Sequence, residues 1–169
     1  MDILYQAIEE KNPNQLKLLI DLGYNIFKIE DKGASLLHFA ADMNCESCAQ
    51  VLIDNGIDVD VKDSRGCTPL IWAAYYDSLE VGIILIKAGA NINYQTHILD
   101  DNVNNLSGEY QETSGDTPLI IASYIGSYKL VELLLRYGAN TEIRNGMGEN
   151  AFDIAKKRGN KKILRLLNR

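Results

Sequence analysis

Short apolar segments alternate with polar stretches along the chain, and the apolar segments come in pairs. In the second member of each pair the apolar residues recur three and four positions apart, which is the spacing of a helix that buries one face. The first member is more uniformly apolar and contains a small residue suited to close contact between helices. The clearest pairs are LLHFAA (36–41) with CAQVLI (48–53), PLIWAA (69–74) with VGIILI (81–86), and PLIIAS (118–123) with LVELLL (130–135). The pattern predicts helix pairs joined by polar connectors.

The polar positions between these segments predict where the helices begin and end. A side chain whose oxygen can cap a helix N-terminus precedes each first segment, and Pro69 and Pro118 follow two of these caps, where a helix needs no N–H. The predicted caps are Asp2, Ser35, Thr68, Thr117 and Asn150. A glycine follows each of the first four second segments, as is typical of a residue that ends a helix in the left-handed conformation. These glycines are Gly23, Gly56, Gly89 and Gly138.

The predicted helix pairs recur with one period along the chain, and that period is interrupted once. A repeated alanine occurs at intervals of 33, 33, 49 and 33 residues, at Ala7, Ala40, Ala73, Ala122 and Ala155. A period of this size predicts a stack of small units rather than one closed core. The interval of 49 residues is one period plus 16, so the third and fourth units are separated by an insertion.

Two of the units resemble the ankyrin repeat. The first match contains Asp63-Ser-Arg-Gly-Cys-Thr-Pro-Leu70 and Gly89-Ala-Asn-Ile-Asn93, and the second contains Gly115-Asp-Thr-Pro-Leu119 and Gly138-Ala-Asn140. The resemblance implies an all-α fold, an ankyrin-repeat solenoid of stacked helix-turn-helix pairs with β-turn or hairpin connectors. It divides a single domain, 1–169, into repeats at about 1–29, 30–62, 63–95, 112–144 and 145–169, of which the terminal two are degenerate, with the insertion at about 96–111.

Charge narrows the class of partner. The formal net charge of -6 opposes general binding to nucleic acid or to a membrane surface. The C-terminal residues 149–169 carry seven basic and two acidic side chains, a balance of +5, so the remainder carries -11. This basic end has two interpretations, a solvated cap on the last unit or a docking patch, and the sequence leaves both open.

Three features predict a cytoplasmic protein. No apolar run is long enough to span a membrane, and the N-terminal residues lack the charged and apolar regions of a signal peptide. The three cysteines, an odd number, fit a reducing compartment. We expect the free protein to be a monomer.

Candidate catalytic and metal-binding chemistry is sparse. Cys45-x-x-Cys48 has no second pair of ligands to complete a zinc site, so we expect both cysteines to be free and Cys48 to pack as a small hydrophobe. The resemblance implies that His38 bonds to backbone in an adjacent turn, and His97 lies in the insertion. We therefore predict no enzyme activity, no cofactor and no metal. The alternative from another class is a metal-binding or catalytic protein that uses Cys45, Cys48, His38 or His97.

The resemblance also implies a binding surface on the concave face, formed by turn tips and by the ends of the first helices. The third and fourth units place tyrosines and an isoleucine at those helix ends, and tyrosine is common at binding hot spots. The predicted contact residues are Met43, Trp72, Tyr75, Tyr76, Asp116, Tyr124 and Ile125. The alternative is that these aromatic side chains only pack along the concave wall.

The insertion, THILDDNVNNLSGEYQ (96–111), is rich in residues typical of loops and predicts a loop or an extended hairpin. We expect it to stand beside the tyrosines and to contribute Asp100, Asp101, Glu109 and Tyr110 to the same surface. The alternative is a tolerated surface insertion, because loop length costs little stability.

Together these features predict a non-enzymatic protein–protein interaction module. Its partner is a protein, with a basic surface that suits the acidic insertion, and neither nucleic acid nor a membrane is expected. An inhibitor or immunity-type protein is one form of such a module. A scaffold, an adaptor or a pathogen effector is the other, and the sequence does not separate them.

Overall fold

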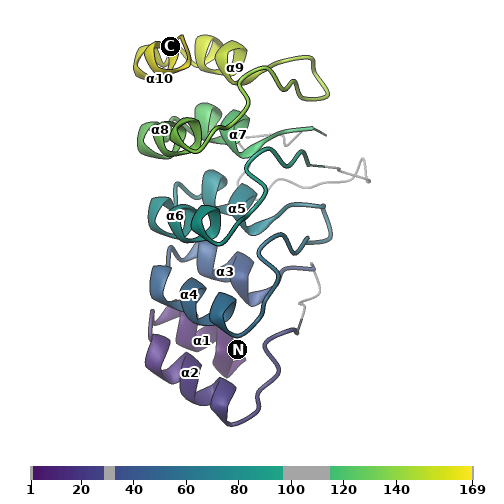
Figure 1. Ribbon diagram of the computed structural model, residues 1–169, viewed down its shortest axis with the longest axis vertical. Coiled ribbons are helices and arrows are strands. Elements are labelled where there is room, and N and C mark those ends of the chain that lie inside the picture. Colours follow the sequence, from purple (N-terminus) through teal and green to yellow (C-terminus); the bar gives the residue numbers. More distant parts are fainter. Residues whose placement is uncertain (1, 29–32, 97–114, 169) are drawn as a thin grey trace.

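The computed structural model describes residues 2–28, 33–96 and 115–168, and within them it places ten helices in five stacked pairs (Figure 1). The first helices of the pairs are α1 (Ile3–Glu9), α3 (Leu36–Asp42), α5 (Pro69–Tyr75), α7 (Pro118–Ile125) and α9 (Ala151–Lys157). The second helices are α2 (Pro13–Asp21), α4 (Glu46–Asp54), α6 (Leu79–Lys87), α8 (Tyr128–Arg136) and α10 (Lys161–Leu167). No strand occurs in these residues, and the predicted all-α repeat solenoid is confirmed.

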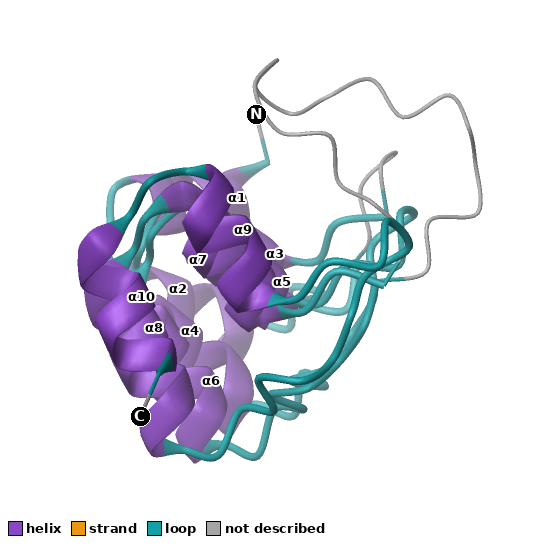
Figure 2. Cartoon of the chain, turned by 90° about the horizontal axis from the view of Figure 1, so that it is seen from above, coloured by secondary structure: helices purple, strands orange, loops and turns teal. Residues whose placement is uncertain are grey.

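The two kinds of helix form two layers along the stack. Figure 2, which looks along the stack, shows the first helices in one layer, the second helices in the other, and the connectors projecting together to one side. Each first helix packs against the first helices of the units before and after it, and each second helix packs in the same way. The core therefore runs through the interfaces between units.

The predicted helix boundaries are confirmed at both ends. The side chain of each predicted cap accepts a backbone N–H in the first turn of its helix, at Asp2, Ser35, Thr68, Thr117 and Asn150. The glycines that follow α2, α4, α6 and α8 all have left-handed φ angles. The sequence pattern missed how three first helices end, because Lys11, Asn44 and Asp77 take the same conformation, with φ of 50°, 47° and 54°, without being glycine.

The repeated alanines and leucines fill the interfaces between units. All five alanines of the 33-residue pattern have no exposed surface. Leu52, Leu85 and Leu134 are equally buried in the second helices. An alanine at each contact lets first helices approach closely, while the leucines supply most of the apolar area removed from water.

An ordinary turn in this array is closed by three hydrogen bonds. In the third unit the N–H of Asp63 donates to the carbonyl of Cys67 (2.9 Å), and the N–H of Gly66 donates to the carbonyl of Asp63 (2.9 Å). The N–H of Cys67 donates to Asp63 Oδ1 (2.8 Å). The fifth unit has the same three bonds, made by Asn145, Gly148 and Glu149.

The turn that contains the insertion is closed in the same way. Thr96 donates to the carbonyl of Asp116 (3.0 Å), Gly115 donates to the carbonyl of Thr96 (2.6 Å), and Asp116 donates to Thr96 Oγ1 (3.0 Å). Thr96 thus takes the place that Asp63 and Asn145 take in their turns. The extra residues fall inside this turn, between Thr96 and Gly115, rather than beginning at Thr96. The predicted loop or hairpin itself lies outside the described residues.

Neighbouring turns touch closely enough to require small residues. A Cβ atom on Gly33 would lie 2.4 Å from the backbone nitrogen of Ser64, and one on Gly115 would lie 3.2 Å from Cα of Asn145. Asn145 also donates from Nδ2 to Asp116 Oδ1 (2.9 Å). The turns therefore form a second contact between units, apart from the helices.

The connectors stack as well, and their stacking continues past the insertion. The N–H of Asn91 donates to the carboxylate of Asp60 in the preceding connector (3.0 Å). The N–H of Asn140 makes the same kind of bond to Asn93 Oδ1 (2.8 Å), although 47 residues separate the two. The connectors of the third and fourth units therefore stack in the same way as those of the second and third units.

Deletion of residues 97–112 should leave the fold intact. The deletion joins Thr96 to Thr113 and leaves a turn as long as the one between Asp63 and Cys67, with its three closing bonds still possible. We expect unchanged helix content by circular dichroism and a free energy of unfolding within about 1 kcal/mol of the parent, because loop length has a small entropic effect. Loss of the cooperative transition would show that the insertion is part of the folded array.

Truncation of Leu134 should be strongly destabilising, because it is fully buried between units. We expect Leu134→Ala to lower the free energy of unfolding by about 2–5 kcal/mol in urea titrations. Leu18, in α2, is 58% exposed, and Leu18→Ala serves as the control with a change of less than about 0.5 kcal/mol. Equal effects of the two substitutions would contradict the assigned core.

Candidate protein-binding surface

Aromatic rings form a row along the layer of first helices. Tyr5 in α1 contacts Phe39 in α3, with ring centroids 5.2 Å apart. Trp72 in α5 contacts His38 in α3 (5.2 Å) and Tyr76 at the end of α5 (5.7 Å). The row crosses from unit to unit, so it ties neighbouring first helices together as well as presenting aromatic surface.

The predicted contact residues of the third and fourth units differ in exposure. Tyr75 is only 8% exposed, and its ring lies 5.1 Å from that of Tyr76. Tyr76 and Tyr124 are half-buried, and the guanidinium of Arg158 lies over the Tyr124 ring at 4.3 Å, a cation–π contact. Ile125 is 38% exposed. The accessible part of the predicted surface is therefore at the last residues of these helices.

Trp72 is half-buried and has a structural partner. Its Nε1 donates to Asp63 Oδ2 (3.0 Å), and Arg65 pairs with the same carboxylate (2.9 Å) and lies over the indole ring (5.7 Å). Trp72 therefore links the turn of the third unit to α5. Because Trp72 is half-buried, only part of its side chain is available for a partner.

Asp116 does not belong to the surface, contrary to our expectation. It is completely buried, and its carboxylate accepts the hydrogen bond from Asn145 that joins two turns. A partner could not reach it without separating those turns. Four other predicted contact residues, Asp100, Asp101, Glu109 and Tyr110, lie outside the described residues.

The end of α3 adds a carboxylate to the same layer. Met43 caps α3 and is half-buried against the core, and Asp42 beside it is also half-buried. Burial raises the pKa of the Asp42 carboxyl, since desolvation disfavours the charged form. No ion pair joins Asp42 to another described residue. A cation placed beside Asp42 would favour its charged form and so oppose the effect of burial.

His38 has the structural role that the resemblance implied. It is fully buried; Nε2 donates to the carbonyl of Cys67 (2.9 Å) and Nδ1 accepts from the backbone N–H of Ser35 (3.1 Å). Burial lowers the pKa of His38. The ring bridges two units in its neutral form and leaves no nitrogen for acid–base work.

The two cysteines of the Cys45-x-x-Cys48 motif are not free thiols, and our expectation was wrong on this point. They form a disulfide with a Cα–Cα distance of 5.3 Å. Cys45 caps α4 and Cys48 lies in the first turn of that helix, which brings the two side chains together. Cys67 is a free, buried cysteine. In residues 2–28, 33–96 and 115–168 no three histidine, cysteine or acidic side chains are grouped to hold a metal ion; His97 lies outside them.

The same residues contain no helix that is long and apolar enough to cross a membrane.

Comparison with known proteins decides the family. Residues 4–96 and 97–168 match the family model described as ankyrin repeats (3 copies). The chain belongs to the ankyrin-repeat family. Ankyrin repeats generally mediate protein–protein interactions, which favours a binding role over a catalytic one for the surface described above.

Relatives come from animals, plants and bacteria. The chain is 29% identical over 110 residues to the B-cell lymphoma 3 protein homolog of Mus musculus, covering 62% of this chain and 25% of the relative. It is 31% identical over 81 residues to calmodulin-binding transcription activator 6 of Arabidopsis thaliana, covering 48% and 10%. It is 30% identical over 109 residues to a putative ankyrin repeat protein of Rickettsia felis, covering 64% and 28%. The chain thus matches between 10% and 28% of the length of these relatives.

The buried His38 should make the stability of this ankyrin array depend on pH. Because its pKa is lower in the folded state than the usual 6.5, the unfolded chain binds a proton first as the pH falls. Stability is therefore lost as the pH drops below about 6.5, by at most about 1.4 kcal/mol per pH unit. The measurement is urea unfolding between about pH 8 and pH 5.5.

His38→Ile is the matched variant, because Ile71 occupies the equivalent position in the third unit. It should be less stable at the upper pH, having lost the bonds to Ser35 and Cys67, but its stability should fall less on acidification. A variant with the same pH slope as the parent would assign the dependence to other groups.

Proposed function

We propose that this ankyrin domain binds a protein partner with a basic surface through the concave face of its third and fourth units. The observation that carries the proposal is the identity of the residue that ends each first helix. In the third and fourth units it is Tyr76 and Ile125, at equivalent positions at the ends of α5 and α7, which pack against each other. In the first and fifth units the same position is held by Glu10 and Arg158.

The fold does not require an apolar residue at this position. Glu10 and Arg158 end their helices there with ordinary backbone geometry. Ile125 is nevertheless 38% exposed in the fourth unit. Exposed apolar side chains grouped next to tyrosines are typical of binding hot spots. A partner that covers Tyr76 and Ile125 would account for their presence.

Electrostatics supports a basic partner. The net charge is -6, and the half-buried Asp42, with its raised pKa, would gain from a neighbouring cation. The insertion begins and ends at Thr96 and Gly115, in the turn between the two units that carry Tyr76 and Ile125. Its acidic residues Asp100, Asp101 and Glu109 lie outside the described residues, and the proposal includes them because their charge suits a basic partner. Complementary charge would mainly speed association and select the partner.

We propose that this domain acts as an inhibitor if the partner surface that it covers contains the partner's active site. A scaffold would bind through the same face and leave the partner active. Assay of the captured partner with and without this chain separates the two forms.

The test is a paired substitution at the helix ends. Tyr76→Ala with Ile125→Ala should weaken binding to a partner captured by the parent protein by about 2 kcal/mol or more, measured by calorimetry. The control is Tyr24→Ala with Tyr137→Ala, which removes two tyrosines that are each 47% exposed and lie outside the first helices. The control should bind like the parent.

Circular dichroism of both double variants should show the helix content of the parent. Equal affinity of the test and control variants, with both folded, would rule out the proposed face. Loss of binding only on deletion of 97–112 would move the site to the insertion.

A further inference from the structure

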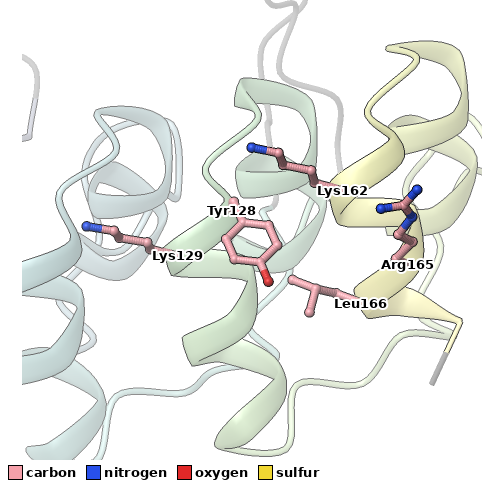
Figure 3. A pocket seen from close by; sticks show the side chains of 5 residues that line it. All are labelled: Tyr128, Lys129, Lys162, Arg165 and Leu166. Carbon is pink, nitrogen blue, oxygen red and sulfur yellow. The ribbon is translucent and has the colours of Figure 1, made fainter.

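A groove lies on the other layer of the array, between the second helices of the fourth and fifth units. It has a volume of about 530 Å³ and is lined by Tyr128 and Lys129 from α8 and by Lys162, Arg165 and Leu166 from α10 (Figure 3). No first helix contributes to it. It is therefore distinct from the concave face and independent of the function proposed above.

The groove combines an apolar floor with a basic rim. Tyr128 is 38% exposed, so its ring is open to a bound group, whereas Leu166 is 8% exposed and presents only a small apolar area in the groove. Lys129, Lys162 and Arg165 are all exposed. No carboxylate lines the groove, and none of the three cations forms an ion pair with a described residue.

One of these cations is shared with the preceding unit. Figure 3 shows Lys129 extending away from Lys162 and Arg165, on the far side of Tyr128. The hydrogen bond from Asn44 is the main cause of the lowered pKa of Glu80, and the charge of Lys129 lowers it further. Lys162 and Arg165, both from α10, therefore supply the positive charge that belongs to this groove alone.

The repeat provides an internal comparison, because the groove between α6 and α8 is built from equivalent positions. Where the α8–α10 groove has Lys129, Lys162 and Arg165, the α6–α8 helices have Glu80, Lys129 and Glu132. The neighbouring groove is smaller, about 270 Å³, and mixes Lys129 and Arg136 with Glu132. The fold therefore accepts an acidic residue at the position of Arg165, as Glu132 in α8, and at the position of Lys162, as Glu80 two units earlier in α6. The rim of the α8–α10 groove lacks the carboxylate that the α6–α8 groove has.

We propose that the groove between α8 and α10 binds an acidic, extended peptide segment of a partner protein, with an apolar side chain placed against Tyr128 and Leu166. The volume is within the range of about 300–1,000 Å³ that is usual for ligand sites. The cationic groups lie on different sides of the Tyr128 ring rather than around one point (Figure 3). That arrangement fits several carboxylates along a chain better than one phosphate group.

The distribution of charge along the chain restricts the binding of an acidic ligand to the C-terminal unit. Residues 149–169 have a balance of +5 within a chain of net charge -6. A long polyanion such as a nucleic acid would meet the acidic remainder, whereas a short acidic segment can occupy the groove without doing so. Attraction of this kind weakens as salt screens it.

The experiment uses the full chain and a fluorescein-labelled, glutamate-rich peptide with a central leucine, followed by fluorescence anisotropy. The parent protein should bind the peptide saturably, and less tightly at higher salt. Lys162→Glu with Arg165→Glu should weaken binding about tenfold or more. These substitutions introduce the residues that the equivalent positions, Glu80 and Glu132, already hold, so the variant should fold.

The matched control is Lys156→Glu with Lys161→Glu. It makes the same change of net charge in the same unit, at exposed lysines that do not line the groove. It should bind the peptide within about twofold of the parent, as expected for charges that act only at long range. Tyr128→Ala, which keeps every charge, should also weaken binding and confirm that the ring takes part.

Four results would overturn the proposal. The first is equal binding by the two double variants, which would make the attraction nonspecific. The second is saturable binding of inorganic phosphate, and the third is pelleting with phosphatidylserine vesicles, each without peptide binding. The fourth is a dimer in sedimentation velocity that Lys162→Glu with Arg165→Glu abolishes while the peptide fails to bind, which would assign the groove to a second copy of the chain.

Discussion

Each unit of this protein depends on its neighbours to remove its apolar surface from water. A helix pair alone leaves its alanine and leucine positions exposed, and only the units on either side bury them. That requirement explains why Ala7 and its counterparts have no exposed surface and why the interior leucines lie between units. It also explains the bonds between units at His38, Asn145 and Asn140. Positions that do not face a neighbouring unit can hold different residues in different units. Residues that bind a partner can therefore occupy them.

The features of the fold that the sequence predicts are those that depend on nearby residues and recur at the same position in each unit. A cap such as Thr68 needs only the first turn of its own helix, and a glycine such as Gly89 needs only its own backbone conformation, so both are visible in the pattern. Asn44 and Asp77 were missed because asparagine and aspartate adopt the left-handed conformation less often than glycine. The position of Thr96 was also missed, since its role in the turn depends on Asp116, which is distant in sequence.

The candidate site was less predictable, because exposure is set by side chains from other units. Tyr75 and Tyr76 are adjacent and identical, yet Tyr75 is buried and Tyr76 is only half-buried. The sequence alone suggests that Asp116 is exposed, but in the structure it is buried and accepts a hydrogen bond from Asn145. The disulfide between Cys45 and Cys48 depends on Cys45 being the cap of α4, which the pattern did not indicate. Comparison of equivalent positions between units was a better guide, since it separates what the fold demands from what varies.

The turn at Thr96 has a consequence for how this molecule can change over time. Its three closing bonds are those of a turn without any insertion, and the stacked connectors at Asn93 and Asn140 continue past it. The closing bonds of the turn and the stacking of the connectors therefore do not involve the chain that leaves at Thr96 and returns at Gly115. Mutations that lengthen, shorten or replace that segment would leave these bonds in place. The turn is a natural grafting point, where one recognition peptide could be exchanged for another on an unaltered support.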